Sequence, residues 1–168
     1  MRRKTHFLTH ASLLAALYAA LTYLQNFLIP GSASWAIQMR LSEALCVLAF
    51  FTPAAIPGLT LGCLLFNITF SAALPLDFLV GSLATYLAAQ VMWLTRNLRV
   101  RGIPLLGLLM PALTNALLVG WELSIYIGGA FAINAVYVAL GELAVLMTLG
   151  TALYLAIRNR GLNTRLFN

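Results

Sequence analysis

The sequence predicts an all-α integral membrane protein that forms a single six-helix domain over residues 1–168. Of the 168 residues, 62% are hydrophobic and only 8% are charged, whereas soluble domains carry about 25% charged residues. Six apolar segments follow one another, and most of them have a length close to the about 20 residues that a helix needs to cross a bilayer. Breaks that contain Pro or Gly separate them. This composition excludes a disordered chain and disfavours a soluble domain.

The breaks define the first three spans. The first segment ends at Pro30-Gly31-Ser32, and the second is short and closes before Pro53. The third begins around Pro57-Gly58, where proline is tolerated in a first helical turn. We expect these spans at residues 6–28, 35–51 and 54–70. Basic residues before the first span resemble a signal peptide, but the apolar run continues to Ile29 without a clear cleavage site, so we expect it to be retained.

The other three spans also have recognisable ends. Pro75 and Asp77 mark the start of the fourth, because proline and an acidic residue are typical of a first helical turn. The fifth ends at Gly128-Gly129, and the sixth runs into the polar tail. We expect these spans at residues 75–95, 103–127 and 130–157.

Basic residues predict the orientation of the helices. Nine of the ten Lys and Arg residues fall in three clusters, before the first span, between the fourth and fifth, and after the sixth. With six spans, all three clusters lie on one side, which the positive-inside rule makes cytoplasmic. Both termini are therefore expected in the cytoplasm, and the basic net charge needs no nucleic-acid partner. The clusters are Arg2-Arg3-Lys4, Arg96-Arg99-Arg101 and Arg158-Arg160-Arg165.

The remaining polar residues gather in the outer half of the bundle. A charged group at membrane depth costs several kcal/mol unless it is paired or faces a wet cavity, so such groups mark function by default. We infer a polar ligand pocket that opens outward. Its expected residues are Arg40, Glu43, Asn67, Asp77, Asn115, Trp121, Glu122, Asn134, Tyr137 and Glu142.

Each polar residue also has a purely structural interpretation. Arg40 and Glu43, three residues apart, can neutralise each other within one helix. Asp77 can be no more than a favourable charge at a helix start, which is the interpretation we favour for it. The three asparagines can be hydrogen-bond contacts between helices. Glu122 and Glu142 have no basic residue near them in sequence, so for these two we favour ligand binding.

The charge balance of the pocket predicts the chemistry of its ligand. Arg40 offsets one of four carboxylates, so the outer half is net negative when all are ionised. Trp121 and Tyr137 offer rings that can stack on a planar group or bind a cation, although Trp and Tyr also form ordinary interfacial belts. A planar, cationic or donor-rich ligand fits better than an anion.

The sequence lacks the motifs that are typical of several functional classes. The sequence has no phosphate-cradling loop, no cluster with metal-ligand spacing, and no Ser or Cys nucleophile with a plausible His base. We therefore expect no enzyme activity, no cofactor and no ATPase of its own. Cys46 and Cys63 lie in apolar runs and predict neither a disulfide nor a metal site.

Small residues recur every four positions in the first span, which allows another helix to approach closely. By pattern alone, we interpret them as packing against helices of this chain. The residues are Ala11, Ala15 and Ala19, with Ala16 and Ala20 adjacent.

Several sequence blocks resemble the QueT family, and together they cover the second to sixth spans. They are residues 40–45 (RLSEAL), 50–58 (FFTPAAIPG), 62–67 (GCLLFN), Asp77 with 81–85 (GSLAT), 115–123 (NALLVGWEL) and 141–143 (GEL). That family is thought to provide the substrate-binding S component of energy-coupling factor (ECF) transporters for queuosine precursors. The combination of blocks is specific, whereas no single block is.

The resemblance implies a bacterial membrane protein of six helices that works with a partner module. That module comprises a transmembrane coupling subunit and two cytoplasmic ATPases. In S components generally, small residues of the first helix contact the coupling subunit, so the resemblance reverses the interpretation of Ala11, Ala15, Ala16, Ala19 and Ala20.

The implied ligand is a 7-deazaguanine: we expect 7-aminomethyl-7-deazaguanine, with its 7-cyano relative or queuine as alternatives. One of Glu122 and Glu142 would hold the guanine edge and the other would neutralise the ammonium group. Two rival functions remain open at this point: an S component for another vitamin-like ligand, and a stand-alone ion-coupled carrier that uses Glu142 as a proton site.

Overall fold

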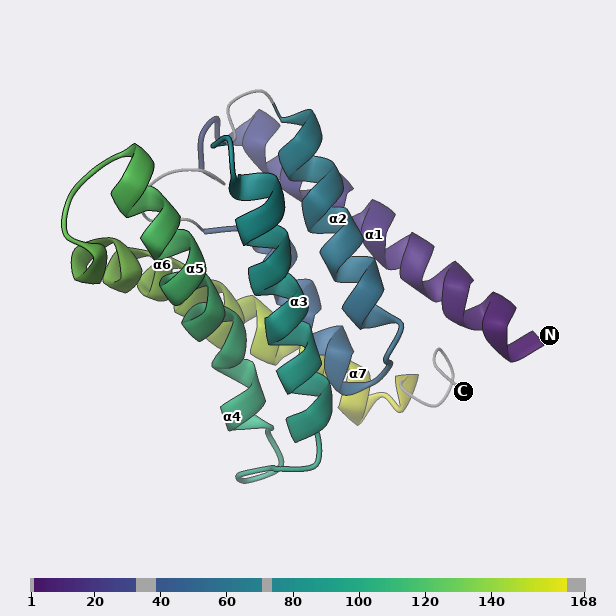
Figure 1. Cartoon of the computed structure of the whole chain (residues 1–168). Coiled ribbons are helices and arrows are strands. Elements are labelled where there is room, and N and C mark those ends of the chain that lie inside the picture. The colour runs from purple at the N-terminus through teal and green to yellow at the C-terminus, as the bar shows by residue number, and fades with distance from the viewer. Residues whose placement is uncertain (1, 33–38, 71–73, 163–168) are drawn as a thin grey trace.

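The computed structural model describes residues 2–32, 39–70 and 74–162, and in these ranges the chain is helical (Figure 1). The start of the second expected span, residues 35–38, and Arg165 lie outside the described residues. In chain order the elements are α1 (Arg2–Leu28), η1 (Leu41–Phe50), α2 (Ala55–Thr69), α3 (Asp77–Thr95), α4 (Leu105–Leu108), α5 (Met110–Tyr126), α6 (Phe131–Val145), η2 (Leu146–Gly150) and α7 (Thr151–Asn159).

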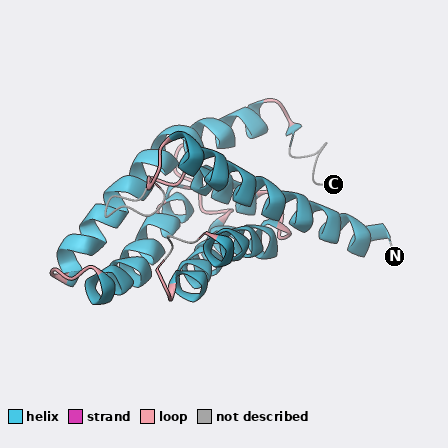
Figure 2. Cartoon of the chain, turned by 90° about the horizontal axis from the view of Figure 1, so that it is seen from above, coloured by secondary structure: helices cyan, strands magenta, loops and turns pink. Residues whose placement is uncertain are grey.

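The long helices form a row in which α1, α2, α3, α5 and α6 each pack against the next. Element η1 lies inside this arrangement and contacts α1, α2, α3 and α6. Figure 2, which views the chain from above, shows that the described residues form helices joined by loops. Because η1 has protein on all sides, its side chains from Ser42 to Phe50 are all buried. The main apolar core therefore surrounds η1 and joins it to α1, α2, α3 and α7.

The second expected span differs from the prediction. Its described part is a ten-residue 3₁₀ helix, Leu41–Phe50, rather than an α-helix. At about 2.0 Å per residue this element is about 20 Å long, which is shorter than the about 30 Å hydrocarbon core. The physical reason is its environment: protein encloses it, so its length is matched to neighbouring helices rather than to lipid.

In the described part of the chain, four helices are long and apolar enough to cross a membrane, namely Lys4–Leu28, Asp77–Thr95, Leu105–Tyr126 and Phe131–Asn159. Helix α2 has 15 residues and is about 22 Å long at 1.5 Å per residue. The expected count of six crossings and the cytoplasmic position of both termini stay predictions. In Figure 1 the start of α1 and helix α7 lie toward the same side of the bundle.

Small residues allow α1 and α2 to pack closely. A Cβ atom at Gly58 would lie 2.7 Å from the carbonyl oxygen of Ala11, and one at Gly62 would lie 2.7 Å from that of Ala15. Both alanines are 6% exposed. Ala11 and Ala15 therefore pack inside this chain, as the spacing alone suggested, whereas Ala16 and Ala20 are exposed and Ala19 is partly exposed.

The last expected span contains a wide turn. Between α6 and α7 the residues Leu146–Gly150 form a π-helix, and the Thr151 hydroxyl donates to the Leu146 carbonyl 3.1 Å away. Single π-turns inserted in α-helices occur frequently at functional sites. This turn begins four residues after Glu142, one of the predicted ligand-binding residues.

Candidate functional site

The fold buries the predicted polar residues of the outer half. Eight of the ten are at most 8% exposed, and they come from four helices and from the start of η1. These eight are Arg40, Glu43, Asn67, Asp77, Asn115, Glu122, Asn134 and Glu142. Because uncompensated burial of charge is costly, the partners of each group decide its role.

Arg40 pairs with Asp77 across the bundle. Its Nη2 lies 3.1 Å from Asp77 Oδ2, and both side chains are at most 5% exposed. Asp77 occupies the first turn of α3, where the helix dipole also favours a negative charge. Asp77 is therefore more than a helix-start charge: it is the buried partner of the one arginine within the apolar segments.

The surroundings of Arg40 come from α2. Its Nη1 donates to Cys63 Sγ at 3.7 Å, and its guanidinium carbon lies 6.0 Å from the centre of the Phe66 ring. Asn67 Nδ2 donates to the main-chain oxygen of Asp77 at 2.9 Å, which ties α2 to the start of α3. One face of α2 thus holds the ion pair in place.

Glu43 is anchored by hydrogen bonds within the fold. The hydroxyl of Tyr18, a fully buried residue of α1, donates to Glu43 Oε1. The thiol of Cys46 donates to Glu43 Oε2 at 3.0 Å. Since both carboxylate oxygens already accept a hydrogen bond, Glu43 has less capacity left for a ligand than the other three acids.

Glu122 and Glu142 face the same interior. Glu122 interacts electrostatically with Asp77 and Arg40, and Glu142 interacts with Glu43 and Arg40. The side chains of the two glutamates are 0% and 1% exposed. Asp77 is thus in direct contact with Arg40, and the other three carboxylates interact with it electrostatically.

Six buried side-chain atoms in this region have no hydrogen-bond partner among the described residues. Unsatisfied buried polar atoms are rare in folded proteins, and each is a candidate contact for a ligand or an ordered water. Five are acceptors and one is a donor. They are Asn67 Oδ1, Asp77 Oδ1, both Oε atoms of Glu122, Glu142 Oε2, and the donor Asn115 Nδ2.

A glycine in α3 leaves space for the side chains of Asp77 and Asn67. A Cβ atom at Gly81, one turn after Asp77 in α3, would lie 2.8 Å from Asp77 Oδ1 and 2.9 Å from Asn67 Nδ2. Any larger residue at this position would displace one of the two side chains. Gly81 therefore belongs to the construction of the site, although it offers no side chain to a ligand.

The comparison with protein families matches the model described as QueT transporter over residues 8–159. The chain belongs to the QueT transporter family. No curated protein and no solved structure matches it. Family membership, together with the four long apolar helices, makes this chain a multi-pass membrane protein of a transporter family.

Two aromatic residues that we predicted to contact the ligand of this QueT family member are not buried with the polar residues. The side chain of Trp121 is 49% exposed and that of Tyr137 is 43% exposed. Rings with this exposure are typical of a lipid-facing or interfacial position. Stacking of either ring on a ligand stays a prediction, and the exposure of the two side chains does not support it.

Asn134 has a structural partner. Its Nδ2 donates to the main-chain oxygen of Gly128 at 3.0 Å, where it fixes the connection between α5 and α6. This contact matches the structural interpretation of the asparagines, whereas Asn67 and Asn115 each keep an unsatisfied atom.

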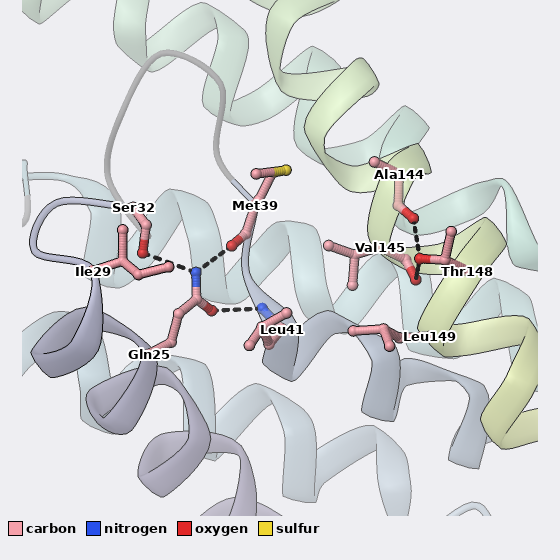
Figure 3. A pocket seen from close by; sticks show the side chains of 9 residues that line it. All are labelled: Gln25, Ile29, Ser32, Met39, Leu41, Ala144, Val145, Thr148 and Leu149. Carbon is pink, nitrogen blue, oxygen red and sulfur yellow. Dashed lines mark hydrogen bonds between the residues drawn. The ribbon is translucent and has the colours of Figure 1, made fainter.

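A separate pocket of about 340 Å³ lies between the end of α1 and the π-turn (Figure 3). Gln25 closes one wall: its Nε2 donates to Ser32 Oγ at 3.0 Å and to the Met39 carbonyl, and its Oε1 accepts from Leu41 N at 2.6 Å. On the opposite wall, Thr148 donates to the Ala144 carbonyl at 2.5 Å. The side-chain polar groups drawn in this pocket are thus used internally, so we do not assign the polar ligand to it.

Sequence reasoning missed several contributors to the site of this QueT family member. Tyr18 and Phe66 look like ordinary apolar-helix residues, and Cys46 and Cys63 look like small buried hydrophobes. Spacing offered a signal for the two cysteines, because residues three or four apart lie side by side on a helix. Cys63 lies four residues before Asn67, and Cys46 lies three residues after Glu43. For Tyr18, which is 25 positions from Glu43, no local signal exists.

Proposed function

We propose that this chain is the substrate-binding S component of an ECF-type transporter, and that it captures 7-aminomethyl-7-deazaguanine from outside the cell for ATP-driven uptake. The observation that supports this most is the set of unsatisfied atoms, which consists of five acceptors and one donor. A site with this imbalance favours a ligand that carries many N–H groups and a positive charge. Membership of the QueT transporter family agrees with this role.

The proposed ligand supplies what these atoms lack. The guanine edge presents adjacent N–H donors to which a carboxylate can bind in a bidentate manner, and Glu122 has both oxygens available. The aminomethyl group is a cation for a second carboxylate, and Glu142 Oε2 is available for it. The ring carbonyl is an acceptor for Asn115 Nδ2. The 7-cyano relative lacks the cation and should bind more weakly.

Transport requires an energy source outside this chain. We propose that a coupling subunit and two ATPases supply it, and that the coupling subunit binds α1. The exposed small residues Ser12, Ala16 and Ala20 form one stripe on α1, whereas Ala11 and Ala15 are buried against α2. The proposed contact is therefore the exposed stripe rather than the buried alanines.

Two tryptophan substitutions test this division. Ala16→Trp should leave the fold and ligand binding intact but abolish ligand uptake in cells that express the partner module, because it places a large ring on the stripe. Ala15→Trp should instead lower stability, because Ala15 is 6% exposed in the close contact between α1 and α2, where a large ring would overpack the helices. Thermal midpoint in detergent and cellular uptake separate the two effects. Equal uptake by Ala16→Trp and wild type would contradict the proposed contact.

Isothermal titration of the purified chain tests the proposed function directly. The aminomethyl and cyano deazaguanines are titrated in turn, with guanine as the control. Tight binding of the aminomethyl form without any partner is the expected result. A preference for the cyano form would retain the transporter assignment and refute the charge argument. Absence of binding to both would refute the deazaguanine assignment.

A further inference from the structure

A tight turn connects α3 to α4 at the end of the bundle that carries the basic residues. Val100 and Ile103 pair as an isolated antiparallel bridge around the two residues between them. Those two, Arg101 and Gly102, have φ angles of 51° and 84°. Positive φ at both central positions is the type I′ pattern, in which Gly, Asn and Asp are favoured and a long side chain is disfavoured. Arg101 thus occupies a strained position.

Helix α7 fixes this turn in place. Arg158 Nη1 donates to the Gly102 carbonyl, and the Tyr154 hydroxyl donates to the same oxygen at 3.4 Å. A Cβ atom at residue 102 would lie 2.5 Å from Arg158 Nη1, so a larger residue there would displace the Arg158 guanidinium. Two basic segments that are about 56 residues apart in sequence are therefore held against each other.

Among the described residues, no carboxylate neutralises the resulting group of charges. We define the basic surface as the exposed residues Arg99, Arg101, Arg158 and Arg160. The chain has four acidic residues in total, and all of them are at most 3% exposed in the interior. The side chains of Arg158 and Arg99 are hydrogen-bonded to main-chain carbonyls, which leaves their positive charges uncompensated.

The basic surface lies where lipid headgroups are expected. Arg99 and Arg101 come shortly after α3, and Arg158 and Arg160 lie at the end of α7. Both helices belong to candidate membrane spans. At the end of α3, the guanidinium of Arg96 stacks on the Trp93 ring at 3.7 Å. Tryptophan beside arginine at a helix end is typical of the headgroup level of a membrane.

We propose that the basic surface binds the phosphate groups of anionic phospholipids in the adjacent leaflet. Charge complementarity identifies the partner, because four uncompensated guanidinium groups at headgroup depth match a negative lipid surface. The strained Arg101 fits this role, since a residue retained in a disfavoured backbone conformation indicates a function for its side chain. This proposal is independent of the ligand that the transporter carries.

Fluorescence quenching by brominated lipids tests the proposal. The full chain carries three tryptophans, so Trp35→Phe/Trp121→Phe leaves Trp93, beside Arg96, as the reporter. The protein is reconstituted in vesicles of phosphatidylcholine and phosphatidylglycerol, with either lipid brominated. We expect quenching per mole fraction to be about three- to five-fold stronger for brominated phosphatidylglycerol. An equal effect of the two lipids would overturn the proposal.

Matched variants identify the residues responsible. Arg99→Gln/Arg101→Gln/Arg160→Gln keeps the Arg158 contact and should bring the ratio close to one, whereas the corresponding triple Lys variant should keep most of the preference. Circular dichroism confirms that each variant is folded. An unchanged ratio in the Gln variant would refute the assignment. Loss of the preference on adding inorganic phosphate, but not sodium chloride of equal ionic strength, would show a site for free anions and overturn the lipid assignment.

Discussion

Asp77→Ala is expected to lower the free energy of unfolding by about 3–5 kcal/mol, because it leaves Arg40 buried without its carboxylate partner. Arg40 is only 4% exposed, so its charge would remain in the protein interior. The loss should appear as a large drop in the thermal midpoint of the detergent-solubilised protein. It should also appear as a lower midpoint in denaturant titration.

A double variant provides the control. Arg40→Met/Asp77→Leu removes both charges and replaces them with apolar side chains, which often costs little or even stabilises a protein. We expect its thermal midpoint to lie well above that of Asp77→Ala and close to wild type. If the double variant is as unstable as Asp77→Ala, the pair is not the cause. Ligand binding by the double variant should still fall, because Asp77 Oδ1 is one of the unsatisfied acceptors.

Glu122→Gln and Glu142→Gln should each weaken binding of 7-aminomethyl-7-deazaguanine by about 10- to 150-fold. This range corresponds to about 1.5–3 kcal/mol for a hydrogen bond to a charged group. The amide keeps the size of the side chain but removes its charge and one acceptor. Isothermal titration measures the effect for each variant, and unchanged affinity in both would refute the assignment of these residues.

Glu43→Gln is the matched control for these two substitutions. Tyr18 and Cys46 already occupy both oxygens of Glu43, so the amide must present a donor where an acceptor was required. We expect the thermal midpoint to fall and the affinity of the folded protein to change less than in the other two variants. A larger loss of affinity in Glu43→Gln than in Glu122→Gln would contradict the division of roles.

The ligand preferences expected of Glu122→Gln and Glu142→Gln also differ. If Glu142 neutralises the ammonium group, Glu142→Gln should reduce the preference for the aminomethyl form over the cyano form. Glu122→Gln should weaken both forms to a similar extent, because both carry the same guanine edge. The ratio of the dissociation constants for the aminomethyl and cyano forms measures this preference in each variant. Identical ratios in the two variants would contradict the proposal that the two acids bind different parts of the ligand.

The outer-half cluster shows how far sequence reasoning reaches in this protein. Charged residues stand out against an apolar chain, and the cost of burying them predicts that they meet. Glu122 and Glu142 were assigned to ligand binding on that basis, whereas Asp77 was interpreted as a helix-start charge. In the structure Asp77 pairs with Arg40, and both glutamates interact electrostatically with Arg40. The pairing of Arg40 with Asp77 was not predictable, because Arg40 could reach several acids and only the fold selects Asp77.

The aromatic and small residues show where that reasoning ends. In a helix that faces lipid, both sides are apolar, so periodicity does not distinguish the inner face from the outer one. Trp121 and Tyr137 were expected to contact the ligand, and their side chains are 49% and 43% exposed. Tyr18, in contrast, contacts Glu43 without any local signal in the sequence. Ala11 and Ala16 are indistinguishable by type, yet one packs on α2 and the other is exposed.

The sequence by itself determined that this is a membrane protein of apolar helices with an acidic interior, because composition and the cost of buried charge do not depend on how helices are arranged. The tertiary structure decided the 3₁₀ form of η1, the partner of Arg40 and the inward faces of α1 and α6. These features depend on rotation of each helix about its axis and on the space left between neighbours. Helix rotation and helix spacing are both set by side-chain packing across the bundle, so they cannot be predicted from residues that are neighbours in the chain.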